Sequence, residues 1–190
     1  LLEGLKRLEY RGYDSAGVAI QTADGLELRR AAGKVGALED KLIAQPLTGQ
    51  VGIAHTRWAT HGVPNEANAH PHISADDIAV VHNGIIENHD EIRQSLDAQG
   101  YQFASETDTE VVAHLIHSLY QGDLWQALRQ ALELLRGAYA LAVTCRAEPG
   151  RIVGARRGSP LVVGVGMDEH FLGSDPLALL HVTDRFVYLD

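Results

Sequence analysis

The sequence lacks several features that would place a protein in a class at once, and cysteine is the scarcest residue of note. Its 190 residues contain one cysteine, Cys145, which cannot form an internal disulfide and fits a reducing compartment. No run approaches the ~20 apolar residues that span a bilayer, and the first residues do not resemble a secretory signal. We therefore expect a cytoplasmic protein without membrane contact.

Basic residues are also few. The 16 lysines and arginines are outnumbered by 25 aspartates and glutamates, which gives a formal net charge of −9. Proteins that bind nucleic acid concentrate Lys and Arg in a patch that neutralises phosphates, and this sequence has no basic block. We expect no nucleic-acid partner.

The composition that remains is typical of a folded globular domain. Hydrophobic residues make up 45% and charged residues 22% of the chain. The length suits one domain, residues 1–190, and no repeat, linker or low-complexity tract interrupts it.

Apolar spacing predicts helices and strands in alternating blocks. Residues 1–9 have helical spacing, and Asp24-Gly25 is the favoured pair for a type I′ turn between strands at 18–21 and 26–31. Thr107 and Glu110 have the spacing of a capping box, and a helical face follows to Leu119. The remaining predicted elements are a helix at 124–135, a strand at 139–145 and strands near Ile152, Val162 and Phe171. Hairpin-length connections favour antiparallel sheets layered with helices, an α+β fold.

The first candidate site follows the apolar run 51–55. Arg57 offers a planar guanidinium matched to a carboxylate, and Thr60 and His61 could complete a shell around the same group. The alternative is a structural arginine paired with an acidic neighbour, and the spacing alone does not separate the two.

A second candidate site follows the apolar run 78–82. Asn83 and Gly84 place a side-chain amide beside an unhindered backbone N–H, two donors that suit a developing oxyanion. The alternative is an ordinary Asn-Gly turn. Asp108, in the first turn of its predicted helix, could bind an ammonium group or simply stabilise the helix N-terminus.

The ten histidines and the single thiol also need an interpretation. The histidines lack the spacing of known metal-binding motifs, so we predict hydrogen-bonded histidines and no metal or other cofactor. Cys145 alternates in phase with Tyr139, Leu141 and Val143, which predicts an inert residue of a core strand rather than a nucleophile.

Taken in order, the motifs resemble the glutaminase domain of the glucosamine-6-phosphate synthase family, a class II glutamine amidotransferase. The resemblance covers the chain from Leu1 to its last residues. It rests on residues 10–17 (YRGYDSAG), 55–62 (HTRWATHG), 68–72 (NAHPH), 81–88 (VHNGIIEN), 105–110 (SETDTE), 157–161 (RGSPL) and 174–175 (SD).

The resemblance implies an N-terminal-nucleophile hydrolase fold, a four-layer α/β/β/α sandwich of two antiparallel sheets. It also implies an enzyme that releases ammonia from L-glutamine through an N-terminal cysteine and a glutamyl thioester. Sugar-phosphate isomerase domains would use that ammonia to convert fructose 6-phosphate to glucosamine 6-phosphate, in a homodimer, as a step of amino sugar biosynthesis.

Residue roles follow from the same resemblance. The glutamine carboxylate is assigned to Arg57, Thr60 and His61, and its ammonium to Asp108 and the Gly84 carbonyl. The oxyanion hole is assigned to Asn83 and the Gly84 N–H. A further implied set comprises Trp58, which gates ammonia passage, and Arg11 and Gly12, which position the nucleophile.

The sequence departs from the family pattern at its start. Leu1 and Leu5 are already in helical register, so we expect the initial strand with the catalytic cysteine to be missing, together with the isomerase domains. Such a fragment is predicted to be inactive. The alternative function is a non-catalytic module that binds or senses glutamine.

Overall fold

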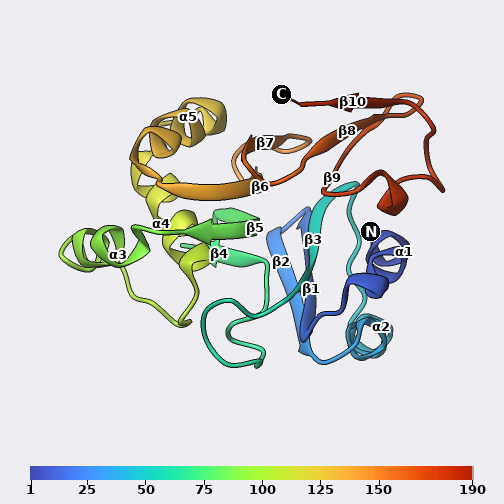
Figure 1. Cartoon of the computed structure of the whole chain (residues 1–190), viewed down its shortest axis with the longest axis horizontal. Helices are drawn as coiled ribbons and strands as arrows, with labels where there is room; N and C mark the ends of the chain where they lie inside the picture. The colour runs from blue at the N-terminus through green and yellow to red at the C-terminus, as the bar shows by residue number, and fades with distance from the viewer. Residues whose placement is uncertain (190) are drawn as a thin grey trace.

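The computed structural model describes residues 1–189 as a layered arrangement of helices and antiparallel sheets (Figure 1). The helices are α1 (Leu2–Arg7), α2 (Val35–Ala44), α3 (His89–Asp97), α4 (Asp108–Leu119) and α5 (Leu124–Leu134), with 3₁₀ turns η1 (Glu9–Arg11) and η2 (Pro176–Ala178). The strands are β1 (Ser15–Thr22), β2 (Gly25–Ala32), β3 (Val51–Arg57), β4 (His72–Ser74), β5 (Ile78–Ile86), β6 (Gly137–Cys145), β7 (Ile152–Arg157), β8 (Val162–Val165), β9 (His170–Gly173) and β10 (Phe186–Tyr188).

The strands form three hydrogen-bonded sheets, and every pairing is antiparallel. The first sheet has the order β2-β1-β3 and the second β4-β5-β6-β7, while β10-β8-β9 form a small third sheet. Helices α1 and α2 pack on the first sheet, and α4 packs on the second with α3 and α5 beside it (Figure 1). The first two sheets thus form the middle layers of an α/β/β/α sandwich.

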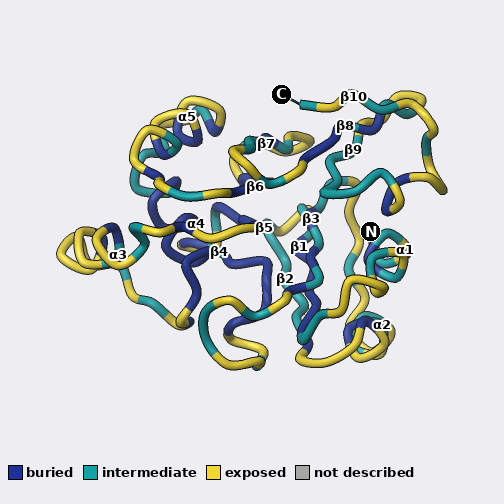
Figure 2. Tube along the Cα trace, viewed as in Figure 1, coloured by how far each residue is buried: buried dark blue, intermediate teal, exposed yellow. Residues whose placement is uncertain are grey.

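The apolar core falls into separate clusters between these layers. Figure 2 marks the buried segments of the chain. The largest cluster lies between the second sheet and α3–α5, and it contains Tyr139, Leu141, Val143 and Cys145, so the predicted inward face of this strand is confirmed. Between the two sheets the cluster is small, with Ala19, Ile53, Ala79 and Val81 as its buried members. Small side chains allow the two sheets to approach each other closely in this layer.

Helix α4 begins at a network of polar side chains rather than at a simple capping box. Thr107 is the N-cap, and its Oγ1 accepts from the Glu110 N–H at 3.3 Å, as predicted. The Glu110 carboxylate does not return to the N-cap N–H. It accepts instead from the backbone N–H groups of Ala104 at 2.9 Å and Ser105 at 2.7 Å, and so orders the segment before the helix.

The turn between β1 and β2 differs from its prediction. Thr22 pairs with Gly25, so Ala23 and Asp24 form the two-residue connection instead of Asp24 and Gly25. Among residues 1–189 the positive φ of this connection falls on Gly25 alone, at 134°. The type I′ prediction is therefore wrong, because the Thr22 hydroxyl accepts from the Asp24 N–H and the turn closes without left-handed central residues.

Two helices are not predicted by the patterns above. Helix α3 buries only Ile92 and Leu96, and α2 buries only Val35 and Leu38, so each apolar stripe is too short to give a clear periodic signal. Helix α5 agrees with its predicted range to within one residue. None of the helices within residues 1–189 has the length and apolar composition that crossing a bilayer requires.

Candidate functional site

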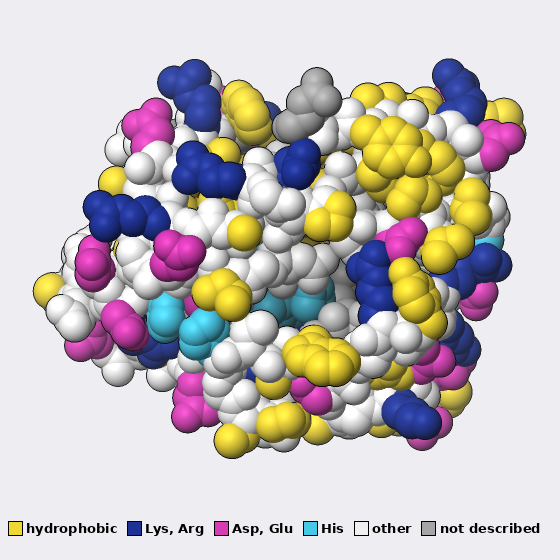
Figure 3. All heavy atoms as spheres, in the orientation of Figure 1, with side chains coloured by type: hydrophobic (Ala, Val, Ile, Leu, Met, Phe, Trp, Pro, Cys, Tyr) yellow, Lys and Arg dark blue, Asp and Glu magenta, His cyan; other side chains and the backbone are white. Residues whose placement is uncertain are grey.

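A cleft of about 2050 Å³ opens between the sheets, and residues of β3, β5, β6 and β9 line it. Its volume exceeds the several hundred Å³ typical of a small-molecule pocket, so the side chains rather than the size locate a ligand. In the space-filling view, histidine atoms gather beside a hollow near the middle of the face shown (Figure 3).

Strand alternation places His55 and the predicted site residue Asn83 on facing surfaces. On β3, His55 is in phase with Ile53, and on β5, Asn83 is in phase with Ala79 and Val81. Because Ile53, Ala79 and Val81 pack together between the sheets, His55 and Asn83 continue the same inner layer into the cleft. His55 Nε2 lies 2.8 Å from Asn83 Oδ1.

Asn83 and Gly84 lie inside β5 and not in a turn. They pair with Ala140 and Tyr139 of β6, which corrects both the predicted end of this strand at His82 and the Asn-Gly turn alternative. Gly84 has a φ of 129°, and a Cβ at this position would overlap the Ala138 carbonyl oxygen. Glycine is therefore required here by the close approach of β6.

The direction of the backbone N–H groups on β5 leaves the Gly84 N–H available. Glu87 donates to the Arg136 carbonyl, so alternation turns the N–H groups of Ile86 and Gly84 to the opposite edge of the strand. The Ile86 N–H donates there to Asp108 Oδ2 at 2.9 Å. The Gly84 N–H lies two residues before it on the same edge.

Asp108 therefore joins α4 to β5. Its side chain is 4% exposed, and its Oδ2 is 3.7 Å from His82 Nδ1. His82 Nδ1 also lies 3.1 Å from Thr109 Oγ1. Burial lowers the pKa of His82, although the nearby Asp108 acts in the opposite direction, so the imidazole is held neutral beside the carboxylate.

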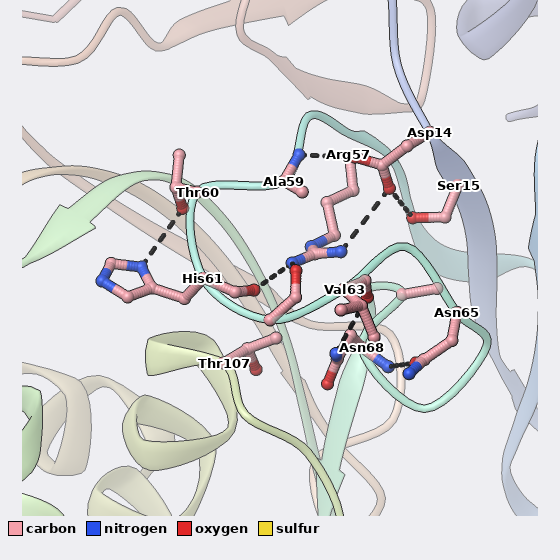
Figure 4. A network of polar contacts seen from close by, with 12 residues as sticks. Asp14, Ser15, Arg57, Ala59, Thr60, His61, Val63, Asn65, Asn68 and Thr107 are labelled. Atoms are coloured by element: carbon pink, nitrogen blue, oxygen red, sulfur yellow. Dashed lines mark hydrogen bonds and ion pairs between the residues drawn. The ribbon is translucent and has the colours of Figure 1, made fainter.

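Arg57 is buried, and its guanidinium holds two parts of the chain together (Figure 4). Its Nη1 lies 3.5 Å from Asp14 Oδ1, while its Nη2 donates to the carbonyl groups of His61 and Gly62. Asp14 also accepts from the Ala59 N–H. The ion pair that the sequence left open as an alternative is thus present, and Arg57 still lines the cleft.

Thr60 and His61 follow Arg57 in the loop and line the same cleft. Their side chains contact each other, with His61 Nδ1 at 3.3 Å from Thr60 Oγ1 (Figure 4). The centroids of the His61 and His89 rings are 4.7 Å apart. The structure therefore brings the three residues assigned to a carboxylate to one rim of the cleft.

Trp58 lies at the cleft rim with 68% of its surface exposed. Its ring covers Gly12, where a Cβ would meet the indole at 2.7 Å and where φ is 74°. The Arg11 side chain binds residues near the end of the chain: its Nη2 is 2.6 Å from Asp175 Oδ2 and its Nη1 is 3.1 Å from Ser174 Oγ. The Ser174-Asp175 motif thus fixes Arg11, the residue before Gly12.

Sequence reasoning missed the way in which the histidines gather. The His55 and His70 rings are 4.5 Å apart, and the His70 and His72 rings are 5.1 Å apart. His55 Nδ1, His70 Nδ1 and His82 Nε2 have no hydrogen-bond partner of good geometry within residues 1–189. In the same part of the chain, no three His, Cys, Asp or Glu side chains are arranged to hold a metal ion.

Cys145 lies far from the polar cleft. It pairs with Ile78 in the β5–β6 ladder, five positions from the Asn83–Ala140 pair, which is roughly 17 Å along the strand. Its side chain belongs to the core on the helix side of the sheet, and burial raises the pKa of its thiol. Its position agrees with the predicted structural role.

The fold and the cleft define an α+β sandwich in which amide donors and charged side chains line a cleft between the sheets. A glutamine amidotransferase domain model matches residues 55–181, well over half of the chain. The chain belongs to this family of glutamine amidotransferase domains.

Individual relatives agree with this assignment. The chain is 63% identical to glutamine–fructose-6-phosphate aminotransferase (isomerizing) of Pseudomonas syringae pv. tomato and 58% identical to that of Bordetella pertussis. Each match covers all of this chain and 32% of the relative, so the chain spans about a third of the length of these curated relatives.

A solved structure supports the fold. Glutamine phosphoribosylpyrophosphate amidotransferase from B. subtilis, complexed with ADP and GMP, matches with a TM-score of 0.82 and 27% identity. The match covers 99% of this chain and 41% of that chain. The predicted α+β sandwich of the N-terminal-nucleophile hydrolase type is confirmed.

Proposed function

We propose that these 190 residues are the glutamine-hydrolysing part of an aminotransferase that makes glucosamine 6-phosphate from fructose 6-phosphate. The observation that carries this proposal is the meeting of Asn83, Gly84, Asp108 and Arg57 in one cleft. The length of the relatives supports further domains, for which the sugar-phosphate isomerase domains are the candidates. A homodimer and a cytoplasmic location stay predictions.

The proposed substrate pose uses opposite ends of the amino acid. Arg57, Thr60 and His61 bind the glutamine α-carboxylate. Asp108 and the Gly84 carbonyl bind its ammonium group. The side-chain carbonyl oxygen then faces the Asn83 Nδ2 amide and the Gly84 N–H, which stabilise the charge that develops there. The proposed cysteine thiolate attacks the amide carbon, the C–N bond breaks as the nitrogen takes up a proton, and ammonia leaves past Trp58. Water then cleaves the C–S bond of the thioester, which gives glutamate and the free thiol.

The proposed nucleophile is an N-terminal cysteine outside these 190 residues. Cys145, the one thiol of the sequence, is buried on the helix side of β6 and does not face the cleft. We therefore expect the 190-residue chain to release no glutamate from glutamine, and the full-length gene product to release it. Replacing Cys145 with Ala should leave that activity unchanged.

A glutamate-release assay on both proteins tests this expectation. If the 190-residue chain matched the rate of the full-length protein, the proposed nucleophile would be wrong. If the full-length protein bound glutamine in calorimetry but released no glutamate, the alternative of a glutamine-binding module would replace hydrolysis.

The carboxylate assignment is tested separately in the full-length protein. Arg57→Ala should raise KM for glutamine by at least about tenfold, because it removes a charge-assisted contact to the ligand. Since Arg57 also contacts Asp14, Asp14→Asn is the matched control for that internal ion pair. Equal KM values for Arg57→Ala and the wild type would remove Arg57 from the pocket.

A further inference from the structure

We propose that His55 is a positioning residue for the oxyanion site, holding Asn83 with Oδ1 turned to β3 and Nδ2 presented to the cleft. This inference rests on the proposed glutamine hydrolysis and adds a residue to it. The two side chains come from different sheets, and the link between His55 Nε2 and Asn83 Oδ1 at 2.8 Å crosses the layer between them.

The orientation of Asn83 matters because its amide ends have opposite chemistry. The Nδ2 end carries two donors and the Oδ1 end only accepts, while the two ends have nearly the same shape. Nδ2 has no hydrogen bond to residues 1–189, which leaves its N–H groups free for a ligand. A rotation by half a turn would present Oδ1 to the developing oxyanion and repel it.

The state of the His55 ring selects one orientation. Burial lowers its pKa to about 4, so at neutral pH the ring is uncharged and carries one N–H. With that proton on Nε2, the ring donates to Asn83 Oδ1 and leaves only a lone pair on Nδ1. With the proton on Nδ1, the lone pair of Nε2 would face the Asn83 Oδ1 acceptor at 2.8 Å, and two acceptors at that distance repel each other.

Neighbouring rings fix the position of His55. His70 stacks on it at 4.5 Å, with 33° between the planes, and His72 meets His70 at 5.1 Å. His72 Nε2 lies 2.9 Å from Thr107 Oγ1, the N-cap of α4, and the next residue is Asp108. This line of contacts connects the amide at Asn83 to the start of the helix that carries the proposed ammonium anchor.

Kinetics of the full-length protein provide the first test. His55→Leu keeps an apolar side chain in the layer but removes the donor, and we expect kcat for glutamine hydrolysis to fall about 10- to 100-fold. KM should change less than about threefold, because the groups assigned to the carboxylate and ammonium remain. His55→Gln, whose amide can donate to Asn83 Oδ1, should recover most of kcat.

A buried histidine outside the cleft serves as the matched control. His114 is buried and its Nδ1 lies 2.8 Å from Ser74 Oγ, so His114→Gln changes the interior in a similar way without touching Asn83. Its kcat should stay within about twofold of the wild type. The positioning role would be wrong if His55→Leu had the same kcat as the wild type. It would also be wrong if His55→Leu and His114→Gln lowered kcat equally.

Nitrogen-15 NMR of the 190-residue chain, with its histidines labelled, provides a readout that does not depend on activity. The two ring nitrogens of a neutral imidazole differ strongly in shift, so the spectrum reports which one carries the proton. We expect the proton of His55 on Nε2, and a proton on Nδ1 would overturn the inference. If the full-length wild type released no glutamate, the proposed function would fail while this result could still be obtained.

Discussion

Two groups of buried polar side chains are connected in space through His72 and differ in how completely they are hydrogen-bonded. The first, here called the capping group, consists of Ser105, Thr107 and Glu110, and its oxygen atoms all have partners in the chain. The second, the cleft histidines, consists of His55, His70 and His82, and each keeps one ring nitrogen without a well-placed partner within residues 1–189.

The two groups therefore contribute differently: the capping group stabilises the fold, and the cleft histidines belong to the proposed site. Buried polar groups are normally hydrogen-bonded, and leaving one unpaired costs about 1–3 kcal/mol. The capping group avoids that cost and orders the entry to α4. The cleft histidines carry that cost. They lie beside Asn83 and Gly84 in the cleft, where unpaired polar groups can bind a ligand.

The largest expected effect lies at the cleft. Asn83→Ala removes one proposed oxyanion donor, and kcat for glutamine hydrolysis by the full-length protein should fall about 10²- to 10³-fold. Its midpoint of urea unfolding should move little, because Asn83 is only half-buried. A large loss of stability with normal kcat would reverse the contrast between the two groups.

The pH dependence of stability should come mainly from the cleft histidines. The folded pKa of His55 is about 4 against 6.5 when unfolded, because burial disfavours the charged ring. The unfolded chain therefore binds more protons between these values, and the contribution of His55 is complete above pH 6.5 and lost as the pH falls towards 4. It amounts to ~3 kcal/mol.

Urea unfolding of the 190-residue chain between pH 7.5 and 4 measures this effect. His55→Gln should show a smaller loss of unfolding free energy on acidification than the wild type. Burial also lowers the pKa of His70 and His72 well below the usual value, so part of the slope should remain in the variant. An unchanged slope would show that His55 does not enter the folded state neutral.

In the capping group, Glu110→Ala should lower the free energy of unfolding by roughly 2–3 kcal/mol. It removes the acceptor of the Ala104 and Ser105 N–H groups, and it leaves the N–H of the buried Ser105 unpaired, whereas Ala104 is exposed. Glu110→Gln, which keeps one carbonyl acceptor, is the matched variant and should lose less. Unfolding curves measure the change, and a stability equal to the wild type would place this group among the dispensable contacts.

The smallest expected effect is at Thr107 of the capping group. Thr107→Ala removes the N-cap of α4 and should cost about 1 kcal/mol, whereas Thr107→Ser keeps the hydroxyl and should cost a few tenths. The change also removes the contact to His72 Nε2. Calorimetric melting of both variants separates the cap from the methyl group, and equal melting temperatures would exclude the cap as the cause.

Local patterns predicted much of the fold because their physics is local. The Thr107 cap needs only Glu110 three residues later, and the inward face of β6 needs only strand alternation. The end of β5 was predicted too early because an Asn-Gly pair has a strong turn preference. Pairing of Asn83 with Ala140 overrides that preference, since the partner strand lies far along the chain.

The sequence by itself determined the alternation of the strands, the cap of α4, the core position of Cys145 and the polar residue types at the site. Only the tertiary structure decided which of them touch. His55 and Asn83 are 28 residues apart and meet because two sheets stack face to face, and Arg57 meets Asp14 43 residues away. Such contacts depend on how layers pack, and no local pattern of residues encodes that distance.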